Sequence, residues 1–194
     1  RADIRRQLEI HRAELADPWC FGFFVDNELQ WGDETDLAKW TWASPDDQAA
    51  KVAFKAWLKA RHGAVPAKPS DDDCRAFSLE IVRAYFSTVR EEVKKAAPGK
   101  LYLGCRFSGA DAFVIDEAQK YCDVMSFNHY DRDVKALVDS WPKGFDKPVM
   151  IGEFHFGAHD RGLFGASLIN VGSQEARGAA LKAYVESALK NPQM

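Results

Sequence analysis

Two glutamates each follow a short apolar run that has the length and composition of a buried strand. Residues 21–25 are aromatic and β-branched, and the three polar residues after them end in Glu28. Residues 148–152 form a second apolar run, which ends in Glu153. Glycoside hydrolysis requires one carboxyl group that protonates the leaving oxygen and a second that attacks the anomeric carbon or activates water. The two glutamates are therefore a candidate catalytic pair. The alternative is that each is simply the first polar residue at the surface after a strand.

Metal chemistry is the other alternative near the second glutamate. His155, His159 and Asp160 lie close to Glu153 in the sequence. They lack the His-Glu-x-x-His pattern or any comparable helical spacing of ligands. We therefore expect neither a catalytic metal nor a cofactor.

Further candidates for the site come at or beyond the ends of other predicted strands. Arg106 ends an apolar stretch, where a cation could orient a carboxylate or a sugar hydroxyl, or could be an ordinary surface arginine. His155 follows Glu153 by two positions, so strand alternation places the two on the same side. Among the tryptophans after Glu28, we favour Trp31 as a platform for the apolar face of a sugar, with core packing as the alternative.

The helices and strands that must position these residues follow from apolar spacing and capping signals. Helices are predicted at residues 1–16, 45–61, 71–96, 111–120, 133–141 and 174–190, and strands at 19–25, 101–106, 123–127 and 149–152. Residues 29–42 and 154–172 are expected to be loops. Ser44, Ser70 and Ser173 are the predicted N-caps of three helices.

Strands that alternate with helices imply a parallel sheet in an α/β fold. In such folds the polar residues at the carboxyl ends of the strands gather at one edge, where sites form. Four strands cannot close a (β/α)8 barrel. The alternative is an open α/β domain, which would also bind ligands at that edge.

The strings at residues 23–32 and 151–157, followed by Asp160-Arg161-Gly162, resemble the β-agarases of glycoside hydrolase family 50, in clan A. The resemblance runs through most of the chain. It implies a (β/α)8 TIM-barrel catalytic domain, of which residues 1–194 would be a part that supplies strands four to seven. Strands one to three and eight would be missing, so the remainder of the barrel would be needed for a complete site. The resemblance also implies a retaining, double-displacement hydrolase of β-1,4-galactosidic bonds in agarose. A β-galactosidase, another clan A β-glycosidase or a non-catalytic carbohydrate-binding fragment remains the alternative.

The same resemblance assigns roles to individual residues. Glu28 would be the general acid/base and Glu153 the nucleophile. Asn27 would bond the sugar 2-hydroxyl, and the hydroxyl of Tyr130 would bond the nucleophile. The alternatives are an asparagine that caps its own backbone and a core tyrosine with a satisfied hydroxyl.

Two more residues precede Tyr130 at the end of the predicted strand 123–127. Asn128 and His129 are adjacent to it in the sequence, so we include them as substrate-binding candidates. A histidine at a strand end can equally be structural.

Composition narrows the class of partner. The chain has 194 residues, of which 46% are hydrophobic and 28% charged, which is ordinary for a globular protein. A formal net charge of −3, with both signs interspersed, argues against nucleic acid or an anionic membrane as a partner. Cys20, Cys74, Cys105 and Cys122 lack the spacing of a zinc site, and we expect buried thiols rather than disulfides. No signal peptide or initiating methionine is visible, so the chain reads as a piece of something longer. The family resemblance implies a secreted or periplasmic protein.

Overall fold

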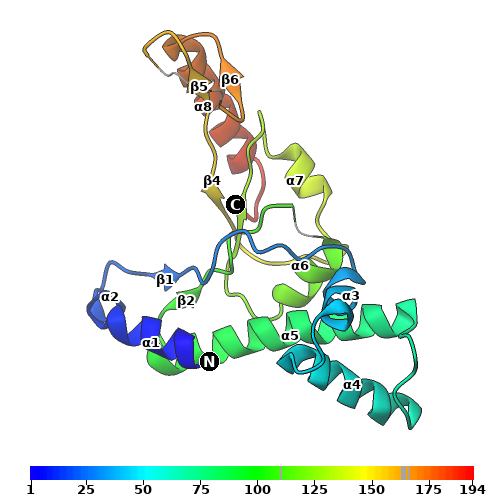
Figure 1. Ribbon diagram of the computed structural model, residues 1–194. Coiled ribbons are helices and arrows are strands. Elements are labelled where there is room, and N and C mark those ends of the chain that lie inside the picture. Colours follow the sequence, from blue (N-terminus) through cyan, green and yellow to red (C-terminus); the bar gives the residue numbers. More distant parts are fainter. Residues whose placement is uncertain (110, 163–164, 166) are drawn as a thin grey trace.

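The computed structural model describes residues 1–109, 111–162, 165 and 167–194 (Figure 1). The helices in this part of the chain are α1 (Ala2–Ile10), α2 (Arg12–Ala16), α3 (Asp36–Ala43), α4 (Ala49–His62), α5 (Asp71–Ala96), α6 (Ala112–Ala118), α7 (Lys135–Asp139) and α8 (Gln174–Leu189). The strands are β1 (Gly22–Phe23), β2 (Leu101–Tyr102), β3 (Met125–Asn128), β4 (Val149–Glu153), β5 (Gly157–Ala158) and β6 (Asn170–Val171). None of these helices is both long and apolar enough to cross a membrane.

The first four strands are parallel neighbours in chain order. β1 pairs with β2, and β3 pairs with β4. A parallel bridge between Phe107 and Phe127 joins the chain beyond β2 to β3. The α/β alternation and the parallel pairing are therefore as predicted, but β1 and β2 are only two residues long. Asn128 and Glu153 are the last residues of β3 and β4, and Arg106 lies beyond the carboxyl end of β2.

Helix α5 is the longest helix and supports one side of the strands. It begins as predicted, because the Ser70 hydroxyl accepts a hydrogen bond from the Asp73 N–H, and the Asp73 side chain accepts one from Ser70 N–H. The first helix of the chain packs near the other end of α5, where Arg1 and Arg5 bond the buried Glu92 carboxylate. In Figure 1, α5 runs along the bottom with α1 beside one end and α3 and α4 beside the other.

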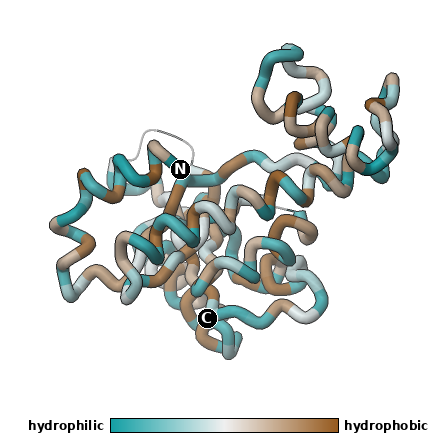
Figure 2. The backbone as a smooth tube through the Cα atoms, turned by 90° about the horizontal axis from the view of Figure 1, so that it is seen from below, coloured by the Kyte–Doolittle hydropathy of each residue, from teal (hydrophilic) through white to brown (hydrophobic). Residues whose placement is uncertain are grey.

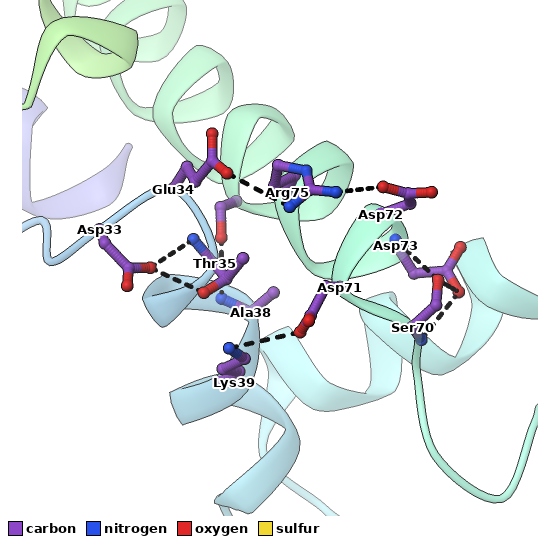
Figure 3. A network of polar contacts seen from close by, with 11 residues as sticks. Asp33, Glu34, Thr35, Ala38, Lys39, Ser70, Asp71, Asp72, Asp73 and Arg75 are labelled. Carbon is purple, nitrogen blue, oxygen red and sulfur yellow. Dashed lines mark hydrogen bonds and ion pairs between the residues drawn. The ribbon is translucent and has the colours of Figure 1, made fainter.

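Helix α3 occupies part of the segment 29–42 that was predicted to be a loop, so that prediction was wrong. The Asp33 carboxylate accepts hydrogen bonds from the N–H and hydroxyl of Thr35, and Asp36 accepts one from Asp33 N–H. These local bonds start the helix. Figure 3 shows its attachment to α5: Lys39 of α3 lies 3.4 Å from Asp71 of α5, and Arg75 of α5 bonds Glu34, which precedes α3.

The predicted start of the next helix is also corrected. Ser44 ends α3 and donates its hydroxyl to Thr41 O, so it is not an N-cap. Helix α4 starts at Ala49 instead, with the Gln48 side chain accepting from two backbone N–H groups. Its end is as predicted, because Gly63 adopts φ 80°, a left-handed conformation that glycine reaches without a steric penalty.

The main core lies between α5, α6 and the strands. Val82, Phe86, Val89, Tyr102, Phe107, Met125 and Phe127 are among its buried members. Figure 2 shows hydrophobic and hydrophilic segments alternating along the helices, as expected where one face of each helix is buried. All four cysteines are described and are free thiols, three of them buried, as predicted.

The segment after β4 carries a smaller core of its own. Residues 154–172 were predicted to be a loop, but they include β5 and β6, which pair in parallel. Two-residue strands are too short for a periodicity to be visible in the sequence. Helix α8 starts at the predicted cap Ser173 and packs on this pair through Tyr184, with Val134 and Phe156. α8, β5 and β6 lie together at the top of Figure 1, away from α5.

Candidate active site

Glu28 is placed by a segment that continues beyond β1 alongside the chain that follows β2. Val25 N–H donates to Gly104 O at 3.0 Å, and Glu28 N–H donates to Cys105 O at 3.1 Å. Between these bonds the backbone turns through left-handed conformations, with φ 63° at Asp26 and φ 50° at Glu28. Such a conformation costs a non-glycine residue about 1–2 kcal/mol. Strain of this kind often marks functional sites.

Arg106 shares this unusual conformation and lies across the strand edge from Glu28. Its φ is 53°. Its N–H donates to the Ser126 hydroxyl at 3.0 Å, and its guanidinium lies 5.4 Å from the ring centroid of Phe24. The arginine side chain is thus directed along the strand ends rather than into solvent.

Glu153 ends β4 and has two strong hydrogen-bond donors. The Tyr130 hydroxyl donates to Oε2, and Arg106 Nη2 donates to Oε1 and, at 3.3 Å, to Gly152 O. The hydrogen bond from Tyr130, followed by the charge of Arg106, holds the pKa of Glu153 below its usual value. The same contact raises the pKa of Tyr130 to about 12. Glu153 is therefore kept ionised, as a nucleophile must be.

Asn128 links the two glutamates. Its side-chain amide donates to Glu28 Oε1 at 2.7 Å, and its hydrogen bond to Glu153 also lowers the pKa of that carboxyl group. Its Oδ1 lies 3.4 Å from Arg106 Nε, and only 6% of the residue is exposed. Hydrogen bonds therefore run from Glu28 through Asn128 and Arg106 to Glu153.

Gly152 is required for this hydrogen-bond network. A Cβ atom at this position would lie 2.8 Å from Asn128 Oδ1 and 3.2 Å from Arg106 Nε. Any side chain would push the amide and the guanidinium away from Glu153. Glycine is therefore needed immediately before Glu153, because a side chain there would clash with Asn128 and Arg106.

The other predicted residues fall at different distances from this centre. Asn27 is exposed beside Glu28. The His155 ring lies edge-on to Tyr130, with 5.0 Å between ring centroids, and its Nε2 accepts from Leu168 N–H. His129 instead contacts Asp133 O through Nε2, a local bond that stabilises the turn before α7.

Trp31 does not have the exposed ring that a sugar platform requires. It is 6% exposed, stacks on Phe86 with 5.4 Å between ring centroids, and meets Tyr85 edge-on at 5.4 Å. Trp31 is therefore a core-packing residue, which was the alternative to a sugar platform. Phe24, which is 38% exposed beside the Arg106 guanidinium, is an aromatic that the sequence reasoning missed. Its position near the end of the first apolar run was the available signal.

Within the described residues, no group of three or more His, Cys, Asp and Glu side chains is placed to hold a metal ion. The arrangement at the strand ends is instead two carboxylates with unlike surroundings. Glu28 has one amide donor, and Glu153 has a phenol, a guanidinium and an amide. Such a difference suits an acid/base and a nucleophile.

Comparisons with known proteins point to one enzyme class. No protein-family model matches the sequence. The chain is 36% identical over 213 aligned positions to β-agarase B of Vibrio sp. (strain JT0107), an alignment that covers 91% of this chain and 22% of the relative. It is 35% identical to β-agarase A of the same strain, over 86% of this chain and 16% of that protein. The chain thus spans about a fifth of the length of these relatives.

Solved structures of similar proteins share the fold. The crystal structure of an agarase, AgWH50C, superposes with a TM-score of 0.82 at 29% identity, over 98% of this chain and 32% of the agarase. An exo-β-agarase gives a TM-score of 0.79 at 28% identity, over 98% of this chain and 30% of that protein. PfGH50B gives 0.83 at 25% identity, over 98% and 33%. Nearly the whole chain therefore has the fold of about one third of an agarase.

Proposed function

We propose that this chain carries both catalytic carboxylates of a retaining glycoside hydrolase of the β-agarase type, with the β-1,4-galactosidic bonds of agarose as its substrate. The observation that carries the proposal is the hydrogen-bond network that joins Glu28 to Glu153 through Asn128 and Arg106. Retaining enzymes hold their two carboxyl groups about 5–5.5 Å apart and inverting enzymes about 6.5–9.5 Å apart, so the proposal expects a separation in the first range. The similarity to agarases supports the substrate class.

The reaction would proceed in two displacements. Glu153 attacks the anomeric carbon while Glu28 donates its proton to the leaving glycosidic oxygen, and a covalent glycosyl-enzyme forms. Glu28, now a carboxylate, then takes a proton from a water molecule that attacks the anomeric carbon and releases Glu153. Each displacement inverts the configuration at the anomeric carbon once, so the product retains the original configuration.

The neighbouring residues have supporting roles in this proposal. Tyr130 and Arg106 keep Glu153 ionised and fix the direction of its oxygens. Asn27, which is exposed beside the acid, would bond the sugar 2-hydroxyl, a contact that strengthens in the transition state. His155, whose ring lies edge-on to Tyr130, would contact the sugar near the nucleophile.

We further propose that the chain forms strands four to seven of a (β/α)8 barrel within a single catalytic domain. The chain-order arrangement of four parallel strands, with polar residues at one edge, supports this. The remaining strands would come from the rest of the domain and would complete the sugar-binding cleft.

The test uses the full-length protein with agarose as substrate. Glu153→Gln and Glu28→Gln should each lower kcat by about 10³-fold or more, on the scale of losing a catalytic group. Glu186→Gln, on an exposed part of α8, is the matched control and should keep full activity. A 2-deoxy-2-fluoro galactoside should add one sugar mass to the peptide that contains Glu153.

Two measurements separate the alternatives. Retained configuration in the first product, followed by NMR, is expected, and an inverted product would contradict the proposed mechanism. Cleavage of short galactosides but not agarose would indicate a β-galactosidase instead. Binding of agaro-oligosaccharides without turnover would indicate a non-catalytic carbohydrate-binding protein.

A further inference from the structure

The chain on either side of Glu28 is held by one side chain of helix α5. The Tyr85 hydroxyl lies 2.7 Å from Asp26 Oδ2 and 3.2 Å from Val25 O. Both acceptors belong to the segment that leads into Glu28. The helix supports this segment from outside the strand edge, so its hold does not depend on a bound sugar.

The Tyr85 ring also contacts the chain beyond Glu28. Trp31 meets it edge-on with 5.4 Å between ring centroids, and Phe86 packs at right angles to it at 4.9 Å. The hydroxyl therefore holds Asp26, two residues before Glu28, while the ring holds Trp31, three residues after it. A rigid, half-buried aromatic brackets the glutamate.

These contacts of Tyr85 help to hold the unfavourable backbone conformation of residues 26–28. Asp26 and Glu28 both have positive φ, which L-residues avoid unless the surroundings impose it. A free segment would relax toward ordinary φ values and swing the Glu28 carboxyl group away from Asn128, which it now contacts at 2.7 Å. Misplacement of a reacting group by about 1 Å can cost roughly 10²-fold in rate.

The Tyr85 hydroxyl stays protonated and can therefore donate a hydrogen bond. Burial, and next its hydrogen bond to Asp26, raise the pKa of Tyr85 well above its ordinary value. The hydroxyl therefore keeps its proton and remains a hydrogen-bond donor at the pH values at which a hydrolase works.

We propose that Tyr85, with Asp26 as its acceptor, is a positioning residue that aims the Glu28 carboxyl group at the leaving oxygen of the substrate. The inference rests on the proposed function, because it takes Glu28 as the proton donor. Tyr85 touches neither the sugar nor the reacting atoms and acts through the backbone of residues 25–28.

The decisive experiment compares two substrates in the full-length protein. One is an agaro-oligosaccharide, whose leaving alcohol needs a proton. The other is the 2,4-dinitrophenyl glycoside of the same sugar, whose leaving group needs none. In Tyr85→Phe we expect kcat/KM to fall about 10- to 100-fold for the oligosaccharide and less than about 3-fold for the dinitrophenyl glycoside. Loss of structure alone would lower both equally.

Two further variants complete the design. Tyr121→Phe removes a tyrosine hydroxyl that bonds Glu117 in the α6 region, and it should leave both kcat/KM values unchanged. Asp26→Asn keeps the side-chain shape and tolerates positive φ, but it weakens the bond from Tyr85. It should show the same substrate selectivity with a smaller effect, and it decides the question if Tyr85→Phe fails to fold.

The outcomes separate this inference from the proposed function. Equal losses on both substrates, or no loss on either, in Tyr85→Phe and Asp26→Asn would overturn the positioning role. Full activity of Glu28→Gln on the oligosaccharide would instead overturn the proposed function itself. If Glu28→Gln is inactive on the oligosaccharide while Tyr85→Phe matches wild type, only the positioning inference fails.

Discussion

Replacing Ser126 by alanine should destabilise the fold at the site more than any surface serine would. The Ser126 side chain is fully buried, and its hydroxyl makes two bonds between neighbouring strand regions. It donates to Leu103 O at 2.6 Å and accepts from Arg106 N–H at 3.0 Å. Alanine at this position leaves both the Leu103 carbonyl and the Arg106 N–H without this hydrogen-bond partner.

The size of the effect follows from the two groups that are left without a partner. A buried backbone group that loses its hydrogen bond costs about 1–3 kcal/mol. Leu103 is 1% exposed, so its carbonyl should suffer most of that cost, whereas Arg106 is half-buried and its N–H can be partly rehydrated. We therefore expect Ser126→Ala to lower the free energy of unfolding by about 2–4 kcal/mol in total. Because Arg106 contacts Glu153, kcat should fall as well.

The assay is urea denaturation of the full-length protein followed by circular dichroism, with kcat measured well below the melting temperature. Ser87→Ala is the matched control, since its exposed hydroxyl makes one 3.4 Å bond within α5, and it should change stability by less than about 0.5 kcal/mol. If Ser126→Ala is no less stable than Ser87→Ala, the hydroxyl does not hold the two strands together and the reasoning is wrong.

Three further outcomes are expected. In Tyr130→Phe the pKa of Glu153 should rise, because the carboxyl group loses the hydrogen bond that lowers its pKa most. Since the nucleophile works only when it is ionised, the acidic limb of the pH profile of kcat/KM should then move to higher pH. An unmoved limb would show that Tyr130 does not set the charge of Glu153. Ser70→Ala should cost about 1 kcal/mol of stability, measured by urea denaturation, since it removes the cap of α5; an unchanged midpoint would mean that the helix end is held by other contacts. Burial raises the pKa of Cys105 to about 12, so its thiol should not react in the native protein. Mass-spectrometric mapping after treatment with a thiol reagent should find Cys105 unlabelled in the native state and labelled after unfolding. Labelling of the native protein would show that this part of the core opens.

Features with a local cause were predictable from the sequence. The capping box at Ser70 and the glycine at position 63 act through neighbouring residues, so their signals are visible along the chain. The apolar runs before Glu28 and Glu153 likewise predicted β1 and β4, which lead to these two carboxyl groups. Their connection through Asn128 and Arg106 required the strand order, which parallel βα alternation supplied.

Features that depend on tertiary contacts were not predictable in this way. Ser44-Pro45 has the local chemistry of a helix start, but α3 already occupies the preceding residues and Ser44 ends it. Trp31 is an aromatic after a catalytic candidate, and only its packing on Phe86 shows that its ring is buried. The contact of Tyr85 with Asp26 spans 59 positions, and no spacing in the sequence marks it.

The long sequence separation within the hydrogen-bonded site has a consequence for how the protein is made. Glu28 and Asn128 are 100 positions apart, and Arg106 and Glu153 are 47 apart. Contacts across such distances close large loops and form slowly compared with helices. During synthesis, α5 can therefore fold while the nucleophile has not yet left the ribosome, and a chain interrupted before β4 would have an acid with no partner. We expect hydrolytic competence to arise late in folding, only after β4 has docked beside β3.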